Sequence, residues 1–210
     1  MAVSLRQIQL KTMIIIKYLG KTVKGYLRRY QDVPPKCEES CPDCHRKLYK
    51  HGRYFRFVIT VKVITRIPIY RRFCPSCGKT FSLLPDFLYP YIIHSGWILQ
   101  KAWILRYMRE KSYNRIHTAI FSNETGGISY KTIKRWDSLW RSNKESLIHF
   151  LLYHLVDVHP IMIEFREIKP LTDEQTLLYL LPKVWKIFHS TTTYPFYGFF
   201  NWINQLMNKI

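Results

Sequence analysis

Apolar and polar residues alternate over residues 54–63, where every odd position carries an apolar side chain and most even positions are polar or charged. This period of two predicts a half-buried strand. A second strand is predicted over residues 65–73, so the two segments together predict a β-hairpin. Pro68 lies in the second strand, and because proline has no N–H group we expect it at a sheet edge or a bulge.

The segments that flank this hairpin carry weaker patterns. Residues 13–18 are a compact apolar run that predicts a strand, and residues 21–30 suit a short amphipathic helix with a cationic face. Pro34 and Pro35 end that helix. After the hairpin, residues 81–90 are rich in proline, and we expect them to form a packed linker without regular structure.

Three helices are predicted next. Residues 94–111 have an apolar face with three- and four-residue spacing, formed by Trp97, Ile98, Ala102, Leu105 and Met108. A short helix capped by Ser112 follows, then a glycine pair at 126–127, and a third helix from the N-cap Ser129 to Trp140. This succession outlines a helix-turn-helix. The alternative is a helical bundle with an ordinary solvated basic face.

The third helix separates its residues by face. Ile133, Trp136 and Trp140 recur at helical spacing and are expected in the core. The outer face, near the start of the helix, then carries Tyr130, Lys131, Lys134 and Arg135. Lysine and arginine would attract phosphates there, while Tyr130 and Arg135 could read base edges.

The last third of the chain is apolar and nearly neutral. We expect a helix over residues 147–156, a strand over 161–168 and a helix over 172–181 that ends before Pro182. The aromatic residues 194–202 would either fill a core or form a contact surface for a protein partner or a second copy. No apolar run is long enough to cross a bilayer, so we expect no membrane association.

Cysteines supply the strongest motif. Two C-P-x-C turns are separated by the predicted hairpin, and their sulfurs are Cys41, Cys44, Cys74 and Cys77. Four thiolates with no open position are typical of a structural zinc site. One C-x-x-C alone could instead be a thioredoxin-like redox pair, but two favour a zinc ribbon. Cys37 is left over as a free thiol, and the absence of a disulfide pattern or a secretory signal favours a cytoplasmic protein.

The formal net charge is +19 at pH 7, and the positive excess lies in the first two-thirds of the chain. Together with many tyrosines and tryptophans, this charge favours nucleic acid over an acidic protein as the partner. Arg71 and Arg72 stand beside the second C-P-x-C turn. They could meet phosphates, or they could offset the negative charge of a thiolate cluster.

No catalytic pattern emerges from the titratable residues. Asp157 has a strand-like setting, but the acidic residues that follow it are spaced too closely for a two-metal nuclease domain. The chain has no H-E-x-x-H pair, no phosphate-binding glycine-rich loop and no nucleophile elbow. The sequence therefore predicts a protein that is not an enzyme.

The predicted fold is α+β: a small β zinc ribbon, a mainly α-helical helix-turn-helix region and an apolar C-terminal segment. The expected divisions are an N-terminal β/helix segment over 1–36, the ribbon over 37–85, the helix-turn-helix over 90–145 and a C-terminal region of unknown role over 146–210. Translation could start at Met1 or at Met13.

Residues 41–44, 51–56 and 69–85 resemble the N-terminal zinc ribbon of bacterial insertion-sequence transposases. The pattern is most similar to a small uncharacterised family of ribbon proteins associated with mobile elements in Gram-positive bacteria. The resemblance covers roughly residues 13–140. It implies that the ribbon and helix-turn-helix bind the ends of an element, with the four cysteines holding zinc. The nuclease domain that follows in those transposases is missing, which implies a binding module or a truncated remnant.

The expected function is therefore zinc-dependent binding of double-stranded DNA, in transposition or in regulation of a mobile element. Two alternatives stay open. The ribbon and the aromatic tail could dock a polymerase or nuclease partner, or exposed Tyr and Phe side chains of the ribbon could stack on unpaired bases of single-stranded RNA.

Overall fold

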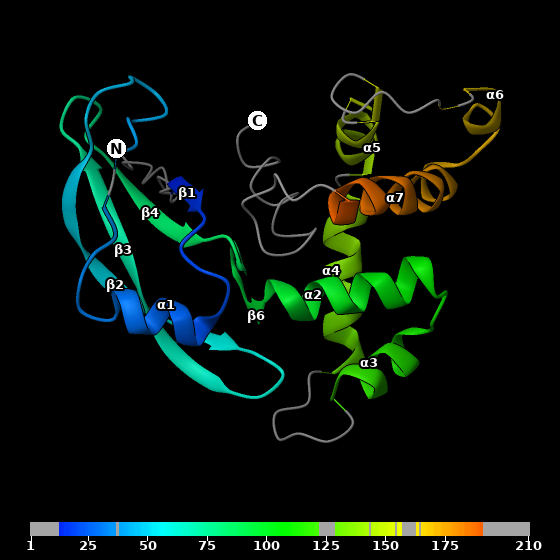
Figure 1. The fold of residues 1–210 in the computed structure, drawn as a ribbon, viewed down its shortest axis with the longest axis horizontal. Coiled ribbons are helices and arrows are strands. Elements are labelled where there is room, and N and C mark those ends of the chain that lie inside the picture. Colours follow the sequence, from blue (N-terminus) through cyan, green and yellow to red (C-terminus); the bar gives the residue numbers. More distant parts are fainter. Residues whose placement is uncertain are drawn as a thin grey trace, which may run out of the picture.

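The computed structural model describes residues 13–36, 38–121, 129–142, 144–153, 155–156, 163 and 165–190. It has the predicted mixture of strands and helices, with most helices after the strands (Figure 1). The strands are β1 (Met13–Lys17), β2 (Tyr49–Ile59), β3 (Ile64–Cys74), β4 (Lys79–Pro85), β5 (Leu88–Tyr89) and β6 (Ile92–Ser95). They form one sheet in the order β1-β4-β3-β2-β6-β5.

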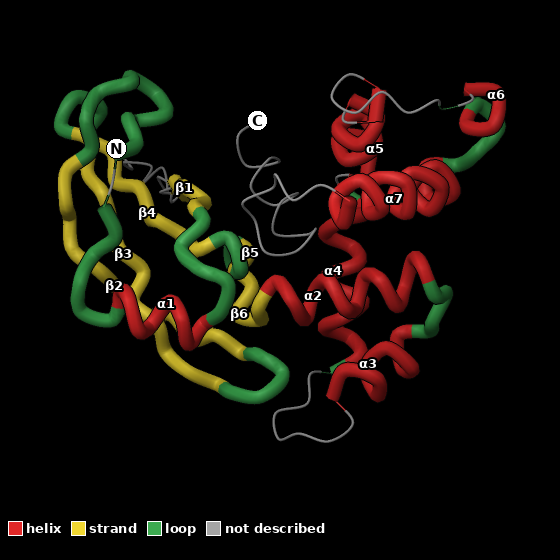
Figure 2. Tube along the Cα trace, viewed as in Figure 1, coloured by secondary structure: helices red, strands yellow, loops and turns green. Residues whose placement is uncertain are grey.

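The helices are α1 (Val23–Tyr30), α2 (Gly96–Trp103), α3 (Tyr113–Phe121), α4 (Tyr130–Arg141), α5 (Lys144–Tyr153), α6 (Phe165–Ile168) and α7 (Asp173–Ser190). A π-helical segment, Ile104–Met108, continues α2. Figure 2 shows α1 against the sheet and the other helices together beyond β6. The sheet and the helical part meet at the β5–β6 hairpin, where Arg56 Nη2 donates hydrogen bonds to the carbonyl oxygens of Tyr89 and Ile92.

β2 and β3 form the predicted antiparallel hairpin. Its closing turn is held by Thr60, whose amide donates to the Val63 carbonyl and whose hydroxyl accepts from the Val63 amide, each over 2.9 Å. The side chain of Thr60 thus supplies a hydrogen bond that holds the turn together.

Pro68 lies inside β3, yet at a local edge of the sheet. β4 pairs with β3 only between Tyr70 and Cys74, so the side of β3 away from β2 is open at Pro68. There its carbonyl oxygen accepts a 2.6 Å hydrogen bond from the hydroxyl of Tyr26. The N–H group that proline lacks is therefore not needed by any neighbouring strand.

α1 packs on one face of the sheet through Tyr26, which is fully buried. Thr22 caps the helix, since its hydroxyl accepts a 3.0 Å hydrogen bond from the Gly25 amide. The Tyr26 ring meets Phe87 edge-on, with centroids 5.8 Å apart. Around this pair lies a small core of apolar side chains, which includes Leu19, Val58, Ile67, Ile69, Leu84 and Leu88.

The expectation of a structureless linker over residues 81–90 was wrong. Most of this segment is β4 and β5, and all of it from Phe81 to Tyr89 is buried. Pro85 ends β4, where it is paired with Lys17 of β1. The prolines thus terminate strands rather than prevent them. β1 pairs in parallel with β4, so residues 13–17 share a sheet with the cysteine-bearing hairpin.

The helices α2, α3 and α4 pack around one core, and the predicted start of α4 is confirmed. Ser129 caps α4 by accepting a hydrogen bond from the Lys131 amide. The predicted face of the first helix is partly right: Ile98 and Ala102 are buried, but Trp97 is 39% exposed. Trp97 lies beside a groove near the β2–β3 turn instead of in this core.

The C-terminal part that the structure describes is helical. The helix predicted over 147–156 is found as α5. The predicted strand over 161–168 is contradicted at residues 165–168, which form α6. α7 does not stop before Pro182 but continues to Ser190. Cys37 and the aromatic segment 194–202 lie outside the described residues, and no helix among those described is long and apolar enough to span a membrane.

Candidate functional site

Four cysteine sulfurs converge at one end of the β2–β3–β4 sheet. Cys41 and Cys44 lie in the loop before β2, whereas Cys74 ends β3 and Cys77 lies in the turn to β4. All four Sγ atoms lie within 4.8 Å of one another. The distances are 3.9 Å from Cys41 to Cys77 and 3.5 Å from Cys44 to Cys74. Sulfurs around a tetrahedral zinc ion, with bonds of about 2.3 Å, are about 3.8 Å apart, so the four sulfurs fit a metal ion.

Each turn is shaped by its own backbone. In the first, the Cys41 amide donates to Arg46 O over 2.7 Å, and the His45 amide donates to Cys41 O over 2.9 Å. His45 has a φ of 56°, which lets the chain reverse. In the second turn, Gly78 has a φ of 64°, a conformation that costs glycine little and other residues more. A 2.7 Å ion pair from Lys79 to Asp43 joins the two turns.

The cage has an apolar base. Cys41 and Cys74 are fully buried, and Leu48 and Phe81 pack beside them. Met13 and Ile15 of β1 pack against the same cluster. Four ligands on such a base, with Cys44 and Cys77 only half-buried at the rim, are typical of a metal that holds structure together.

The Cys77 thiol holds its proton tightly. Hydrogen bonding to Cys44, burial and contacts with Cys41 and Cys74 raise the pKa of the Cys77 thiol. A metal ion bound by this sulfur as a thiolate would have to displace its proton, so such binding would depend on pH.

Arg71 and Arg72, the two arginines beside the second cysteine turn, differ in how deeply they are buried. Arg72 is only 2% exposed, and its Nη2 donates to the carbonyl oxygen of Pro35. Its guanidinium therefore lies inside the protein and ties the segment before the first cysteine to β3. Arg71 is half-buried and lines a hollow of about 260 Å³ together with Lys50 and Arg53. Arg72 also lines this hollow, although almost none of its surface reaches solvent.

The residues predicted on α4 divide between its two faces as the spacing indicates. Ile133, Trp136 and Trp140 are buried. The opposite face exposes Tyr130, Lys131, Lys134 and Arg135. This face begins at the helix N-terminus, where the peptide dipole adds to the positive charge.

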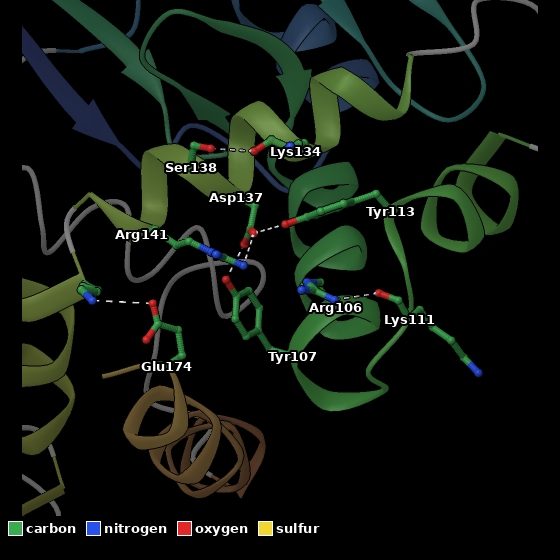
Figure 3. Close-up of polar contacts among 10 residues, drawn as sticks. Arg106, Tyr107, Lys111, Tyr113, Lys134, Asp137, Ser138, Arg141 and Glu174 are labelled. Carbon is green, nitrogen blue, oxygen red and sulfur yellow. Dashed lines mark hydrogen bonds and ion pairs between the residues drawn. The ribbon is translucent and has the colours of Figure 1, made fainter. Parts of the chain in front are cut away.

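One buried charged residue of α4, Asp137, is missing from the sequence-based predictions. Asp137 is 5% exposed, and its carboxylate accepts hydrogen bonds from the hydroxyls of Tyr107 and Tyr113 (Figure 3). Arg141, one turn later, makes a 3.0 Å ion pair with the same carboxylate. Burial and the neighbouring Asp137 raise the pKa of Tyr107, so its hydroxyl keeps its proton and donates.

This Asp137 cluster fixes the orientation of α4. Tyr107 comes from the π-helical segment after α2, and Tyr113 comes from α3. One carboxylate therefore ties α4 to two neighbouring segments. The sequence did contain a signal: Asp137 completes an i, i+3, i+4, i+7 face with Ile133, Trp136 and Trp140, and a charged residue on such a face requires partners.

Comparison with known proteins gives one match. Residues 41–136 match the model of a domain of unknown function, DUF6431. The matched region begins at the first cysteine of the cage and ends inside α4, so it contains both the four-cysteine cage and the exposed start of α4. No curated protein and no solved structure matches the chain.

Proposed function

We propose that this chain binds double-stranded DNA through the exposed start of α4, with α3 and α4 acting as a helix-turn-helix and a structural zinc ion in the four-cysteine cage. The observation that carries the proposal is the cationic face of α4, on which Lys131, Lys134 and Arg135 are exposed and Tyr130 is 45% exposed. A long helix with its polar face free and its first turns basic is suited to the major groove.

Three further features support this assignment. The net charge of +19 attracts a polyanion over a long range. The Asp137 cluster holds α4 rigidly, which a base-reading helix needs. The resemblance of the cysteine region to insertion-sequence transposase ribbons points to the ends of a mobile element as the target. The proposal assigns DNA binding in the cytoplasm and no catalytic step to the chain.

Lys134→Ala tests the proposal. If Lys134 contacts a phosphate, its loss should weaken binding to all duplexes and reduce the slope of log K against log salt by about 0.9. Fluorescence anisotropy of the zinc-loaded protein with random and selected duplexes, over a series of salt concentrations, measures both quantities. Lys169→Ala removes an exposed lysine beyond α6 and serves as the matched control.

Arg135→Ala should act differently. Loss of a base contact reduces the preference for the selected duplex over random DNA, by about 1–3 kcal/mol for a bidentate contact. If the Lys134 and Lys169 variants behave alike, α4 is not the DNA-binding surface. If Arg135→Ala weakens all duplexes equally, α4 binds DNA without reading its sequence.

A further inference from the structure

The outer face of the β2–β3 hairpin carries two phenylalanines in a position where soluble sheets usually carry polar residues. Phe55 is 48% exposed and Phe57 is 54% exposed. Burying a phenylalanine side chain stabilises a folded protein, so two half-exposed rings leave part of that stabilisation unused. The fold does not explain them, since the core under the hairpin is built from residues of the opposite face.

Two arginines alternate with these rings. Arg66 lies directly opposite Phe57 in the strand register, and its guanidinium carbon is 5.4 Å from the ring centre of Phe57 and 5.4 Å from that of Phe55. Arg53 stands 5.3 Å from the ring centre of Phe55. We call this row of four side chains, Arg53, Phe55, Arg66 and Phe57, the arginine–phenylalanine ladder.

Arg53 and Arg66 differ in their polar contacts with the rest of the protein. Arg53 Nη1 donates a 2.6 Å hydrogen bond to Gln31 O and lies 3.7 Å from the Asp32 carboxylate. Arg66 is exposed and makes no ion pair within the part of the chain that the structure describes. Cation–π contacts at exposed sites are weak, so the Arg66 charge stays available to a phosphate.

The spacing of the ladder suits unpaired bases. Alternate residues of a strand are about 6.8 Å apart, and bases stacked within one nucleic-acid strand are about 3.4 Å apart. A base stacked between two neighbouring rings would therefore match their spacing. Because the Arg66 guanidinium lies 5.4 Å from both ring centres, a base that enters there would displace it. Aromatic rings and guanidinium planes stack on every base, whereas a paired duplex does not offer its base faces.

We propose that the arginine–phenylalanine ladder binds single-stranded DNA, with bases stacked on Phe55 and Phe57 and a phosphate paired with Arg66. This goes beyond the proposed function, because it assigns a second surface and a second form of DNA. It rests on that function only in taking DNA as the ligand, and the two surfaces use different residues. A protein with both surfaces would hold a duplex and an opened strand together.

The test uses the full-length zinc-loaded protein and a labelled oligothymidine of about 12 nucleotides. Phe55→Ala together with Phe57→Ala should weaken its binding at least about tenfold, because each stacked base contributes about 1–3 kcal/mol. Tyr91→Ala removes an aromatic residue that is 79% exposed outside the ladder, and this matched control should bind within about twofold of wild type. Arg66→Gln should weaken binding and lower its salt dependence.

The outcomes separate this proposal from duplex binding. Both surfaces are supported if the double variant loses oligothymidine but keeps duplex affinity, while Lys134→Ala does the reverse. The ladder is overturned if the double variant binds oligothymidine as wild type does, or if Tyr91→Ala loses as much. It is also overturned if wild type prefers oligouridine to oligothymidine, since the bound strand would then be RNA. Zinc content and far-UV circular dichroism of each variant show that it is folded.

Discussion

The Asp137 carboxylate is stabilising only as part of its cluster. A buried charge is costly unless it is paired and hydrogen-bonded, and here Tyr107, Tyr113 and Arg141 supply the partners. Removing Tyr107 would leave Oδ1 without its hydrogen-bond donor, and removing Arg141 would leave the buried carboxylate without its ion pair. At the scale of the residue, α4 is therefore positioned by one carboxylate rather than by apolar contacts alone.

Asp137→Asn tests this conclusion. The amide keeps the shape of the side chain but loses the charge and presents N–H groups to hydroxyls that already donate. We expect the free energy of unfolding to fall by about 1.5–3 kcal/mol, the range for hydrogen bonds to charged groups. Urea denaturation measures it, with the exposed neighbour Ser138→Ala as a control that should change it by less than about 0.5 kcal/mol. An unchanged midpoint for Asp137→Asn would show that the charge contributes nothing.

Asp86 is a second buried carboxylate, and unlike Asp137 it lacks, within the described part of the chain, side-chain partners that would stabilise its charge. It is fully buried, neither of its oxygens has a hydrogen-bond partner of good geometry, and burial raises its pKa from 3.8 to about 7 although the Phe87 and Asp86 amides oppose this. The folded protein therefore holds this proton more tightly than the unfolded chain. At low pH the carboxyl group is neutral in both states and has no effect on the free energy of unfolding. As the pH rises from about 4 to about 7, the free energy of unfolding falls, because the unfolded chain loses the proton more readily.

Asp86→Asn should remove this pH dependence. The variant is expected to exceed the wild type in free energy of unfolding by about 1–3 kcal/mol at pH 8, with the difference shrinking as the pH falls toward 4. Urea unfolding of both proteins at several pH values measures the difference. Asp32→Asn, which changes an exposed carboxylate, should show no such trend. A constant difference across the pH range would contradict the raised pKa.

At the scale of the element, the four-cysteine cage is assembled by the β2–β3 hairpin. Two short turns, far apart in sequence, are brought together because β2 and β3 pair and β3 then turns back into β4. Neither turn has a core of its own beyond Leu48 and Phe81. A segment this small usually needs a metal or a disulfide to hold it together.

Cys44→Ser should therefore destabilise the turns as well as the site. We expect loss of bound zinc and faster cleavage of the loop before β2 by a protease, since metal binding and local folding are coupled. Cys37→Ser is the matched control, because Cys37 is predicted to be a free thiol. Metal content by mass spectrometry and a digestion time course give the two readouts. If Cys44→Ser keeps its metal and its digestion pattern, the cage is not a structural site.

At the scale of the whole molecule, the sequence correctly predicted the features that depend on neighbouring residues. The β2–β3 hairpin, the two cysteine turns and the capped start of α4 each depend on residues close in sequence, and all are present in the structure. The metal they suggest and the DNA they would contact stay predictions. The buried and exposed faces of α4 follow from spacing alone.

Features that depend on distant partners were missed. Residues 81–85 form a strand because β1 and β3 lie on either side of β4, and residues 88–89 form one because they pair with β6. Their own proline-rich sequence does not reveal these partners. Arg72 is buried because Pro35, far away in sequence, accepts its hydrogen bond. Asp137 finds its hydroxyl donors on two other segments. A periodic pattern predicts on which side of a helix or strand a residue lies. It does not predict which distant segment packs against that side.

β1 connects the cysteine cage to the N-terminal part of the sheet. This strand pairs with β4, and its Met13 and Ile15 side chains pack against the apolar base of the cage. A metal ion that orders the cage would therefore favour docking of β1, and docking of β1 would raise the affinity for that ion by the same factor. Under the proposed zinc site, the position of this N-terminal strand would report whether the cage is filled.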